Sequence, residues 1–196
     1  PAKMKNTFSI NSYQKVKLIR FLRELVTHNK HTNLVGKSTL SNPWRRHVLD
    51  CIQVSSFINN KNSKILDMGP GAGLPGLVLA MVGYNNVSLV DSNGKKINFV
   101  KFISKKLDIK VKIFLSRIEK LNNKKFDFLI SRALANLNKL LFYSSLLSHK
   151  STKLLFLKGK NLTSEIKFAK NHWKFNFLTH NSISDSRGRL IIINSF

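Results

Sequence analysis

The sequence holds few acidic residues and a single cysteine, and each scarcity excludes a class of protein. Only 9 of its 196 residues are Asp or Glu, which leaves little material for a carboxylate-rich metal centre. Cys51 alone forms neither an internal disulfide framework nor a multi-cysteine zinc site. No apolar stretch approaches a membrane span, and the beginning of the sequence lacks the apolar block of a signal peptide. We therefore expect a cytoplasmic protein that uses neither a membrane nor a metal ion.

Basic residues outnumber acidic ones by 34 to 9, which gives a formal net charge of +25. Such a field attracts polyanions and indicates a nucleic-acid partner. The excess consists of 26 Lys and only 8 Arg, however, and the chain also contains 21 Asn. Recognition of phosphates and bases generally favours Arg, so drift toward Lys and Asn codons explains the charge equally well. The composition supports RNA binding without establishing it.

The segment 65–76, ILDMGPGAGLPG, is the most informative part of the chain. It predicts a buried strand that ends in an acid, a glycine-rich turn, and a helix that begins near Pro75. A second apolar run, 87–90, ends at Asp91, whose carboxylate suits a ribose diol. Strand, glycine turn, helix, strand and acid together are typical of the nucleotide-binding half of a doubly wound α/β fold.

Two cofactors compete for this turn. G-x-G-x-x-G over residues 71–76 fits a dinucleotide site, with Asp91 in the place of the ribose acid. D-x-G-x-G-x-G over residues 67–73 fits the loop of class I S-adenosylmethionine (SAM) methyltransferases, in which Gly69 follows the strand at once. A SAM loop wraps the amino-acid end of the cofactor, where Asp67 is useful near the ammonium. The pattern favours SAM, and a tight turn without a ligand is the simplest alternative.

The chain divides into a predicted N-terminal helical extension, 1–62, packed on the core, and a predicted SAM-binding methyltransferase domain, 63–196. Helical spacing predicts helices over 13–29, with Ser12 as N-cap, and over 43–58. Beyond them strands and helices alternate, so we expect a Rossmann-like α/β fold with a mostly parallel sheet and helices on both faces. The seven predicted strands cover 64–68, 87–91, 111–115, 126–131, 153–158, 174–178 and 189–194, of which the last two allow an antiparallel hairpin. The helices predicted between them cover 75–83, 94–107, 136–147 and 162–171.

Ligands of such sheets bind beyond the carboxyl ends of the strands, which selects candidate residues. Arg132 follows a strand among small residues, where it suits an anion or a base edge. Ile118 and Glu119 follow the third strand and suit adenine, although a helix start explains the pair as well. Lys158 ends the fifth strand, and Gly159 after it leaves room for a ligand.

Two further candidates, His47 and Asp50, lie three residues apart and so share one face of the second helix. Spacing alone favours an ordinary polar pair on a helix surface. The remaining histidines show no spacing that suggests a metal site, and the sequence contains no P-loop and no nucleophile elbow.

Six short motifs, taken in order, are specific in combination. They are Asn33-Leu34-Val35, Arg46-His47-Val48-Leu49-Asp50, Asp67 through Gly76, Asp91-Ser92-x-x-Lys95-Lys96, Ser131-Arg132-Ala133-Leu134-Ala135 and Leu157-Lys158-Gly159. With them the chain resembles the bacterial small-subunit rRNA guanine-N7 methyltransferases, the glucose-inhibited division protein B or RsmG family. The match runs from about Asn33 to the C-terminus.

The resemblance implies that SAM is the cofactor and that its methyl group goes to N7 of a guanosine in the 530 loop of 16S rRNA. The small ribosomal subunit is then the partner, and we expect a monomer. The candidate catalytic residues are Arg132, Asp50 and His47. The candidate cofactor-binding residues are Asp67, Gly69, Gly71, Gly73, Leu74, Asp91, Ile118, Glu119 and Arg132. The candidate RNA-binding residues are Arg46, Lys95, Lys96, Lys158 and Arg187.

Other functions remain open on the residues alone. A SAM methyltransferase with another RNA or small-molecule substrate and an NAD-dependent oxidoreductase both keep the glycine turn. A basic RNA-binding protein with a decayed cofactor pocket is a third alternative, against which the intact residues from Asp67 to Gly73 argue. Guanine N7 carries a lone pair and no proton, so its methylation needs no general base, which agrees with the absence of an evident catalytic base.

Overall fold

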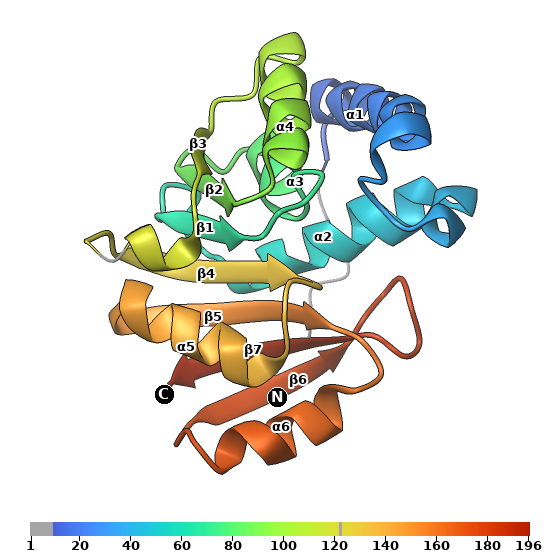
Figure 1. The fold of residues 1–196 in the computed structure, drawn as a ribbon. Helices are drawn as coiled ribbons and strands as arrows, with labels where there is room; N and C mark the ends of the chain where they lie inside the picture. Colours follow the sequence, from blue (N-terminus) through green and yellow to red (C-terminus); the bar gives the residue numbers. More distant parts are fainter. Residues whose placement is uncertain (1–9, 122) are drawn as a thin grey trace.

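The computed structural model describes residues 10–121 and 123–196 and is built around one seven-stranded sheet (Figure 1). The strand order is β3-β2-β1-β4-β5-β7-β6, in which the first five strands are parallel and β7 runs antiparallel to both of its neighbours. The strands are β1 (Ile65–Met68), β2 (Val87–Asp91), β3 (Lys112–Leu115), β4 (Phe126–Arg132), β5 (Ser148–Lys158), β6 (Asn176–Asn181) and β7 (Arg189–Ser195). The predicted fold class, strand number and terminal hairpin are confirmed.

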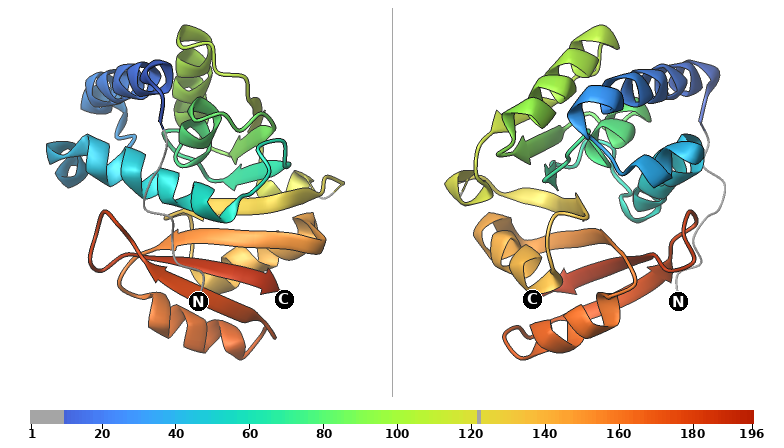
Figure 2. Two further views of the ribbon diagram at one scale, coloured as in Figure 1. Left: turned by 180° about the vertical axis from the view of Figure 1, so that it is seen from behind. Right: turned by 45° about the vertical axis from the view of Figure 1, so that its right-hand side comes forward.

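Each face of the sheet carries its own apolar core, because successive residues of the central strands point to opposite sides. On β4, Phe128 and Ile130 belong to one core and Leu129 to the other. The first core is covered by the helices that precede β3, and the second by those that follow it (Figure 2). The long helices are α1 (Ser12–Thr32), α4 (Gly94–Lys106), α5 (Leu137–Leu147) and α6 (Leu162–Lys170), and the short α3 (Gly76–Met81) follows the glycine turn.

Helix α1 begins one residue earlier than predicted. Its N-cap is Asn11 rather than Ser12, since the Asn11 side chain accepts the backbone N–H of Gln14 at 2.9 Å and the Gln14 side chain accepts that of Asn11 at 3.1 Å. This reciprocal pair satisfies two N–H groups that the first turn leaves without partners. Leu18, Phe21 and other apolar residues of α1 pack into the core of the sheet, so the helical segment shares that core. Residues 1–9 of the predicted extension lie outside the described residues.

The helix predicted over 43–58 is present but ends at Phe57, one residue early, and it changes type twice. It consists of a π-helix, η2 (Trp44–Leu49), one turn of α-helix, α2 (Asp50–Ile52), and a 3₁₀-helix, η3 (Gln53–Phe57), and a separate 3₁₀ turn, η1 (Lys37–Ser41), precedes it. Local π geometry inside a helix is frequent at functional sites. Here it falls on the stretch that carries Arg46 and His47.

Strand β5 begins five residues before its predicted start. Its first half consists mainly of polar residues, so the sequence pattern of a strand is absent there. Thr152 is buried, donates its hydroxyl to the Phe126 carbonyl at 2.6 Å and accepts the N–H of His149 at 2.8 Å. The pairing with β4 shifts in register at this point, between Phe126 and Phe128. This part of the strand is paired through a side-chain hydrogen bond and a bulge, so its sequence does not show the alternation of apolar and polar residues that predicts a strand.

The order of strands β2-β1-β4 places a crevice at the carboxyl ends of β1 and β4, because the chain leaves these two neighbours in opposite directions. The glycine turn follows β1, and Arg132 is the last residue of β4. Within the described residues, no helix is both long and apolar enough to cross a bilayer.

Candidate active site

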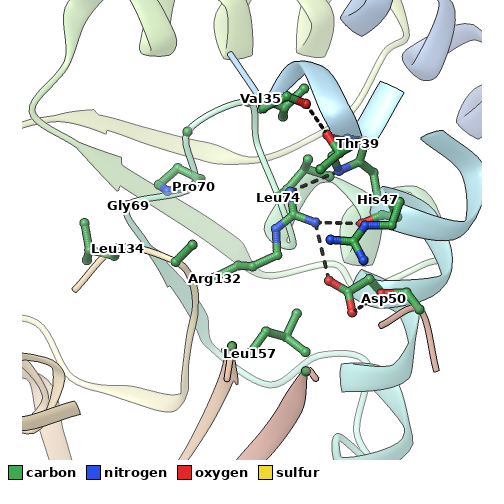
Figure 3. A pocket seen from close by; sticks show the side chains of 18 of the residues that line it. Val35, Thr39, His47, Asp50, Gly69, Pro70, Leu74, Arg132, Leu134 and Leu157 are labelled. Carbon is green, nitrogen blue, oxygen red and sulfur yellow. Dashed lines mark hydrogen bonds and ion pairs between the residues drawn. The ribbon is translucent and has the colours of Figure 1, made fainter. Parts of the chain in front are cut away.

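A cavity of about 490 Å³ lies at this crevice, within the usual range of small-molecule sites. Its two sides differ in chemistry. We call one side the glycine wall, which consists of Gly69–Ala72, Leu74, Asp91, Lys96 and Leu134. We call the other the polar wall, which consists of Thr39, Arg46, His47, Asp50, Arg132, Ser182, Ser184 and Asp185 (Figure 3).

The glycine wall depends on backbone conformations that favour glycine. Gly69, Gly71 and Gly73 have φ angles of 66°, 56° and 89°, which residues with a Cβ adopt only with strain. A Cβ at Gly69 would also overlap the side chain of Leu134. Asp91 holds the turn in place, since its carboxylate accepts the N–H of Gly71 at 3.3 Å. The loop therefore presents bare backbone to the cavity beside a carboxylate.

Asp67 lies behind the glycine wall rather than in it. Its side chain is fully buried, Oδ2 accepts the N–H of Gly76 at 2.6 Å, and Oδ1 has no partner among the described residues. Burial raises the pKa of Asp67 to about 7, against the opposing effect of the Gly76 hydrogen bond. Asp67 thus joins β1 to the start of α3. Neither Asp67 nor Gly73 lines the cavity, whereas Gly69, Gly71, Leu74 and Asp91 do.

Arg132 is the centre of the polar wall. Its guanidinium reaches from the end of β4 to the helical segment that precedes the sheet (Figure 3). Nη2 contacts Nδ1 of His47 at 3.1 Å, and Nη1 donates to the carbonyl of Arg46 at 3.1 Å and lies 3.5 Å from Oδ2 of Asp50. Three acceptors from one helical segment therefore fix the plane of the guanidinium.

The hydrogen bonds around His47 determine its tautomer. Thr39 donates its single hydroxyl proton to the carbonyl of Gly36 at 2.6 Å, so its oxygen accepts from Nε2 of His47, 3.0 Å away. Nδ1 then carries the lone pair that accepts from Arg132. Burial, together with the charges of Arg132 and Arg46, lowers the pKa of His47 to about 3, and the ring is neutral at physiological pH.

Asp50 ties the C-terminal hairpin to this wall. Its Oδ1 accepts from the hydroxyls of Ser182 at 2.9 Å and Ser184 at 2.8 Å and from the amide of Gln53 at 2.9 Å. Oδ2 faces Arg132. The carboxylate is therefore engaged at both oxygens, by Gln53 of its own helical segment and by groups from two distant parts of the chain.

A second ion pair joins the same hairpin to the helical segment. Arg46 contacts Oδ2 of Asp185 at 2.7 Å, and Arg187 contacts Oδ1 of Asp185 at 3.3 Å. Hydrogen bonds from Arg187 and Arg46 hold the pKa of Asp185 well below its usual range. The side chain of Arg46 is committed to Asp185, whereas that of Arg187 is 71% exposed.

The remaining predicted residues have different positions. Lys96 lines the cavity, and Lys95 is exposed beside it. Lys158 lines it too, but its side chain is only 6% exposed and its ammonium contacts Glu165 and the carbonyl of Ala135, each at 2.6 Å. Ile118 and Glu119 lie in η4 (Ile118–Leu121) and do not line the cavity. Ile118 is buried in the second core, and Glu119 is exposed.

Four side chains of the polar wall are not predicted from the sequence, namely Thr39, Ser182, Ser184 and Asp185. Hydroxyl residues are common in loops, and nothing in the pattern of 182–185 distinguishes it from an ordinary turn. Their partners lie up to 139 residues away in the chain. Only the position of Thr39, close to the Asn33-Leu34-Val35 motif and to His47, offered a signal.

Comparison with known proteins decides the family. The GidB family, rRNA small subunit methyltransferase G, matches residues 14–191. The chain belongs to this family. The ribosomal RNA small subunit methyltransferase G of Rickettsia prowazekii (strain Madrid E) is 38% identical over 167 residues, which are 85% of this chain and 86% of that protein. Membership confirms the predicted SAM-dependent methyltransferase, with SAM as its cofactor, and sets aside the oxidoreductase.

Solved structures confirm the fold of this GidB member. The ribosomal protein L11 methylase from Lactobacillus delbrueckii subsp. bulgaricus aligns with a TM-score of 0.64 at 15% identity, over 74% of this chain and 76% of that one. The magnesium protoporphyrin IX methyltransferase from Synechocystis PCC 6803 with bound SAM aligns with a TM-score of 0.63 at 14% identity, over 97% and 100% of the two chains.

The residues of the cavity fit the cofactor. The bare backbone of the glycine turn allows close approach at Gly71, where a Cβ would have no atom nearer than the Leu34 carbonyl oxygen at 4.0 Å, whereas Leu134 already fills the corresponding space at Gly69. Asp91 offers carboxylate oxygens to hydroxyl groups, and Leu74 offers an apolar surface. In the described part of the chain, no three His, Cys, Asp or Glu side chains are grouped so that they could hold a metal ion.

Proposed function

We propose that this enzyme transfers the methyl group of SAM to N7 of a guanosine in the RNA of the small ribosomal subunit. One observation supports N7 as the methylated atom. Every carboxylate and imidazole that lines the described cavity already has a hydrogen-bond or ion-pair partner within the protein, so none is free to act as a general base. Asp50 and His47 are held by the network around Arg132, Asp185 by two arginines, and Asp91 by backbone N–H groups. Such a cavity suits a nucleophile that has a lone pair and no proton to lose.

The reaction needs little from the protein besides alignment. When bound, SAM supplies an electrophilic methyl carbon, and its transfer to N7 leaves a neutral thioether and moves one positive charge onto the guanine ring. The glycine wall, with Gly69, Gly71, Leu74 and Asp91, holds the cofactor in this proposal. Proximity and orientation then provide most of the rate enhancement.

Arg132 is the catalytic residue in this proposal because it reaches the centre of the cavity with its guanidinium plane fixed. N7 must stay free for the methyl group, so Arg132 donates to O6 of the guanine or to the cofactor rather than to N7. Asp50 and His47 act through Arg132 and are positioning residues. Asp50 also places a negative charge near the ring that becomes positive.

The RNA substrate is a loop or an extruded base in this proposal. The major groove of A-form RNA is too narrow for a protein to reach N7, so an unpaired guanosine such as one in the 530 loop of 16S rRNA suits the cavity. Exposed Lys95 and Arg187, with Lys96 at the rim, are the proposed RNA contacts. Arg46 and Lys158, which are committed to Asp185 and Glu165, shape the cavity instead. Ile118 and Glu119 remain proposed adenine contacts.

We further propose a cytoplasmic monomer, because ribosomal subunits are the substrate. The division into a helical extension, 1–62, and a methyltransferase domain, 63–196, is part of the same proposal. The packing of Leu18 and Phe21 against the sheet supports an extension that does not move independently.

The direct test is transfer of a labelled methyl group from SAM to small subunits that lack the mark, followed by chemical cleavage at 7-methylguanosine. Label at one loop guanosine is the expected result. Transfer to another atom or another RNA would disprove the assignment of N7, and SAM binding without transfer would move the substrate outside the small subunit.

A further inference from the structure

A second cavity of about 560 Å³ lies beside the first, between the start of α6, strand β6 and the turn before β7. Gly159 and Arg189 line both cavities. A Cβ added at Gly159 would meet no atom within 4 Å, so the shared edge is open there. A ligand longer than one nucleotide can therefore extend from one cavity into the other.

The two cavities differ in charge. The first has three carboxylates in its lining, those of Asp50, Asp91 and Asp185. The described lining of the second contains no acidic residue but three cations: Lys160, Arg187 and Arg189. Three hydroxyl groups and one aromatic ring also line it, from Thr163, Thr179, Ser186 and Phe177. Cations and hydroxyls suit phosphate oxygens, and aromatic rings stack on unpaired bases.

Codon drift does not explain this cluster. The excess charge of the chain comes from Lys, yet two of the three cations here are among its only 8 Arg residues. Arg offers a planar fork that binds phosphate in a bidentate manner. Arg189 donates from Nη1 to the carbonyls of Ser186 and Gly188, both at 2.9 Å, which fixes the turn that carries Arg187.

We propose that the second cavity binds the backbone phosphate of the nucleotide next to the methylated guanosine. This inference rests on the proposed function, because the guanosine in the first cavity is what brings its neighbour to the second. A strand that passes Gly159 enters a lining whose charged side chains are all positive. The second cavity then sets the register of the RNA, and the first performs the chemistry.

The test compares two charge reversals of equal size. Lys160→Glu changes the second cavity. Lys101→Glu changes an exposed lysine on α4, a helix that packs on β2 and β3 at the edge of the sheet opposite to β6. Both variants lower the net charge by the same amount, so any effect of the overall field is shared. KM, kcat and RNA affinity are measured with unmethylated small subunits over a range of salt concentrations.

Lys160→Glu is expected to raise KM by about tenfold more than Lys101→Glu, with SAM affinity unchanged. Loss of one phosphate contact lowers the slope of log affinity against log salt by about 0.7 in magnitude, and only Lys160→Glu should show this. Lys160→Ala combined with Arg187→Ala should double the change in slope.

Equal effects of Lys160→Glu and Lys101→Glu would overturn the proposal, because the charge would then act only as a general field. A fall in kcat with KM and salt slope unchanged would overturn it as well. Failure of the proposed function looks different: the unmodified protein itself would then not methylate small subunits at a guanine N7.

Discussion

The glycine wall and the polar wall of the same cavity are built in opposite ways. The glycine wall comes from one β–α–β stretch, 65–91, and depends on backbone angles. The polar wall joins three segments, near 39–50, at Arg132 and over 182–185, through side-chain hydrogen bonds. Short-range geometry therefore shapes the side proposed for the cofactor, and long-range polar contacts shape the side proposed for the base. Substitutions should damage the two sides in different ways.

The largest effect is expected at Arg132, where the contacts of His47, Asp50 and the Arg46 carbonyl converge. Arg132→Ala removes the guanidinium and leaves Asp50 and His47 without their shared partner. Transfer should fall by about 10²–10³-fold, the usual cost of losing a charge-stabilising donor, and an accompanying loss of SAM affinity would mean that Arg132 contacts the cofactor rather than O6. Single-turnover transfer of labelled methyl to small subunits measures the rate, and calorimetry measures SAM binding.

Arg132→Lys is the matched control, since it keeps the charge but not the fork. One ammonium cannot meet His47, Asp50 and the Arg46 carbonyl in the same plane, so this variant should recover little of the lost rate. Full activity in Arg132→Lys would show that charge alone matters, and an unchanged rate in Arg132→Ala would remove Arg132 from the mechanism.

The next largest effect concerns Asp67, the buried acid behind the glycine wall. Its pKa is raised to about 7, so between about pH 4 and 7 the folded protein holds a proton that the unfolded chain has lost. The stability contributed by this group is complete below about pH 4 and is lost as the pH rises through 7. His47, with its pKa lowered to about 3, has the opposite dependence.

Asp67→Asn removes one titration and leaves that of His47 in place. The free energy of unfolding of the variant should therefore rise relative to the unmodified protein between pH 4 and pH 8. Each unit of pKa shift corresponds to about 1.4 kcal/mol, so the relative gain amounts to a few kcal/mol. Urea denaturation at both pH values measures it. A difference between the proteins that is constant with pH would mean that Asp67 stays ionised.

A third comparison lies within the glycine wall, between Gly69 and Gly71. Both have positive φ, but a Cβ at Gly69 would overlap Leu134, whereas at Gly71 the nearest atom, the Leu34 carbonyl oxygen, is 4.0 Å away. Gly71→Ala carries backbone strain alone, about 1 kcal/mol, and Gly69→Ala adds the clash and should cost about 2–3 kcal/mol. Thermal unfolding with and without SAM separates the two. Equal costs would show that Leu134 moves aside freely.

The features of the molecule that the sequence predicts are the local ones, as in the glycine wall, and those that it does not predict are long-range contacts, as in the polar wall. The strand, glycine turn and acid from Ile65 to Asp91 are local patterns, and alternation along the chain was enough to predict seven strands. Arg132 was found because it ends a strand. The serine partners of Asp50 were not predicted, because the hydrogen bond between Asp50 and Ser184 spans 134 residues. A contact of this kind produces no periodic pattern of residue types in the sequence. Asp67 was expected beside the cofactor, but its burial under α3 depends on packing.

The smallest expected effect tests how far the polar wall extends. Thr39 contacts Arg132 only through His47, whose Nε2–H it accepts. Thr39→Val removes that acceptor and should lower transfer by about fivefold, the value of one hydrogen bond, whereas Thr39→Ser should retain the rate. SAM affinity should be the same in both variants. Nitrogen-15 spectra of labelled histidine supply a readout that simple packing would not change, because the His47 signals report which ring nitrogen carries the proton.

Two results for Thr39 lead to different conclusions about the whole cavity. A slower Val variant with an altered His47 tautomer means that orientation of the guanidinium is transmitted from η1 through the imidazole, so the polar wall acts as one unit. Equal rates for Val and Ser mean that the network ends at His47, and Asp50 and the Arg46 carbonyl suffice to align Arg132. In that case the C-terminal turn, which reaches Arg132 through Asp50, becomes the segment whose movement would disturb transfer most.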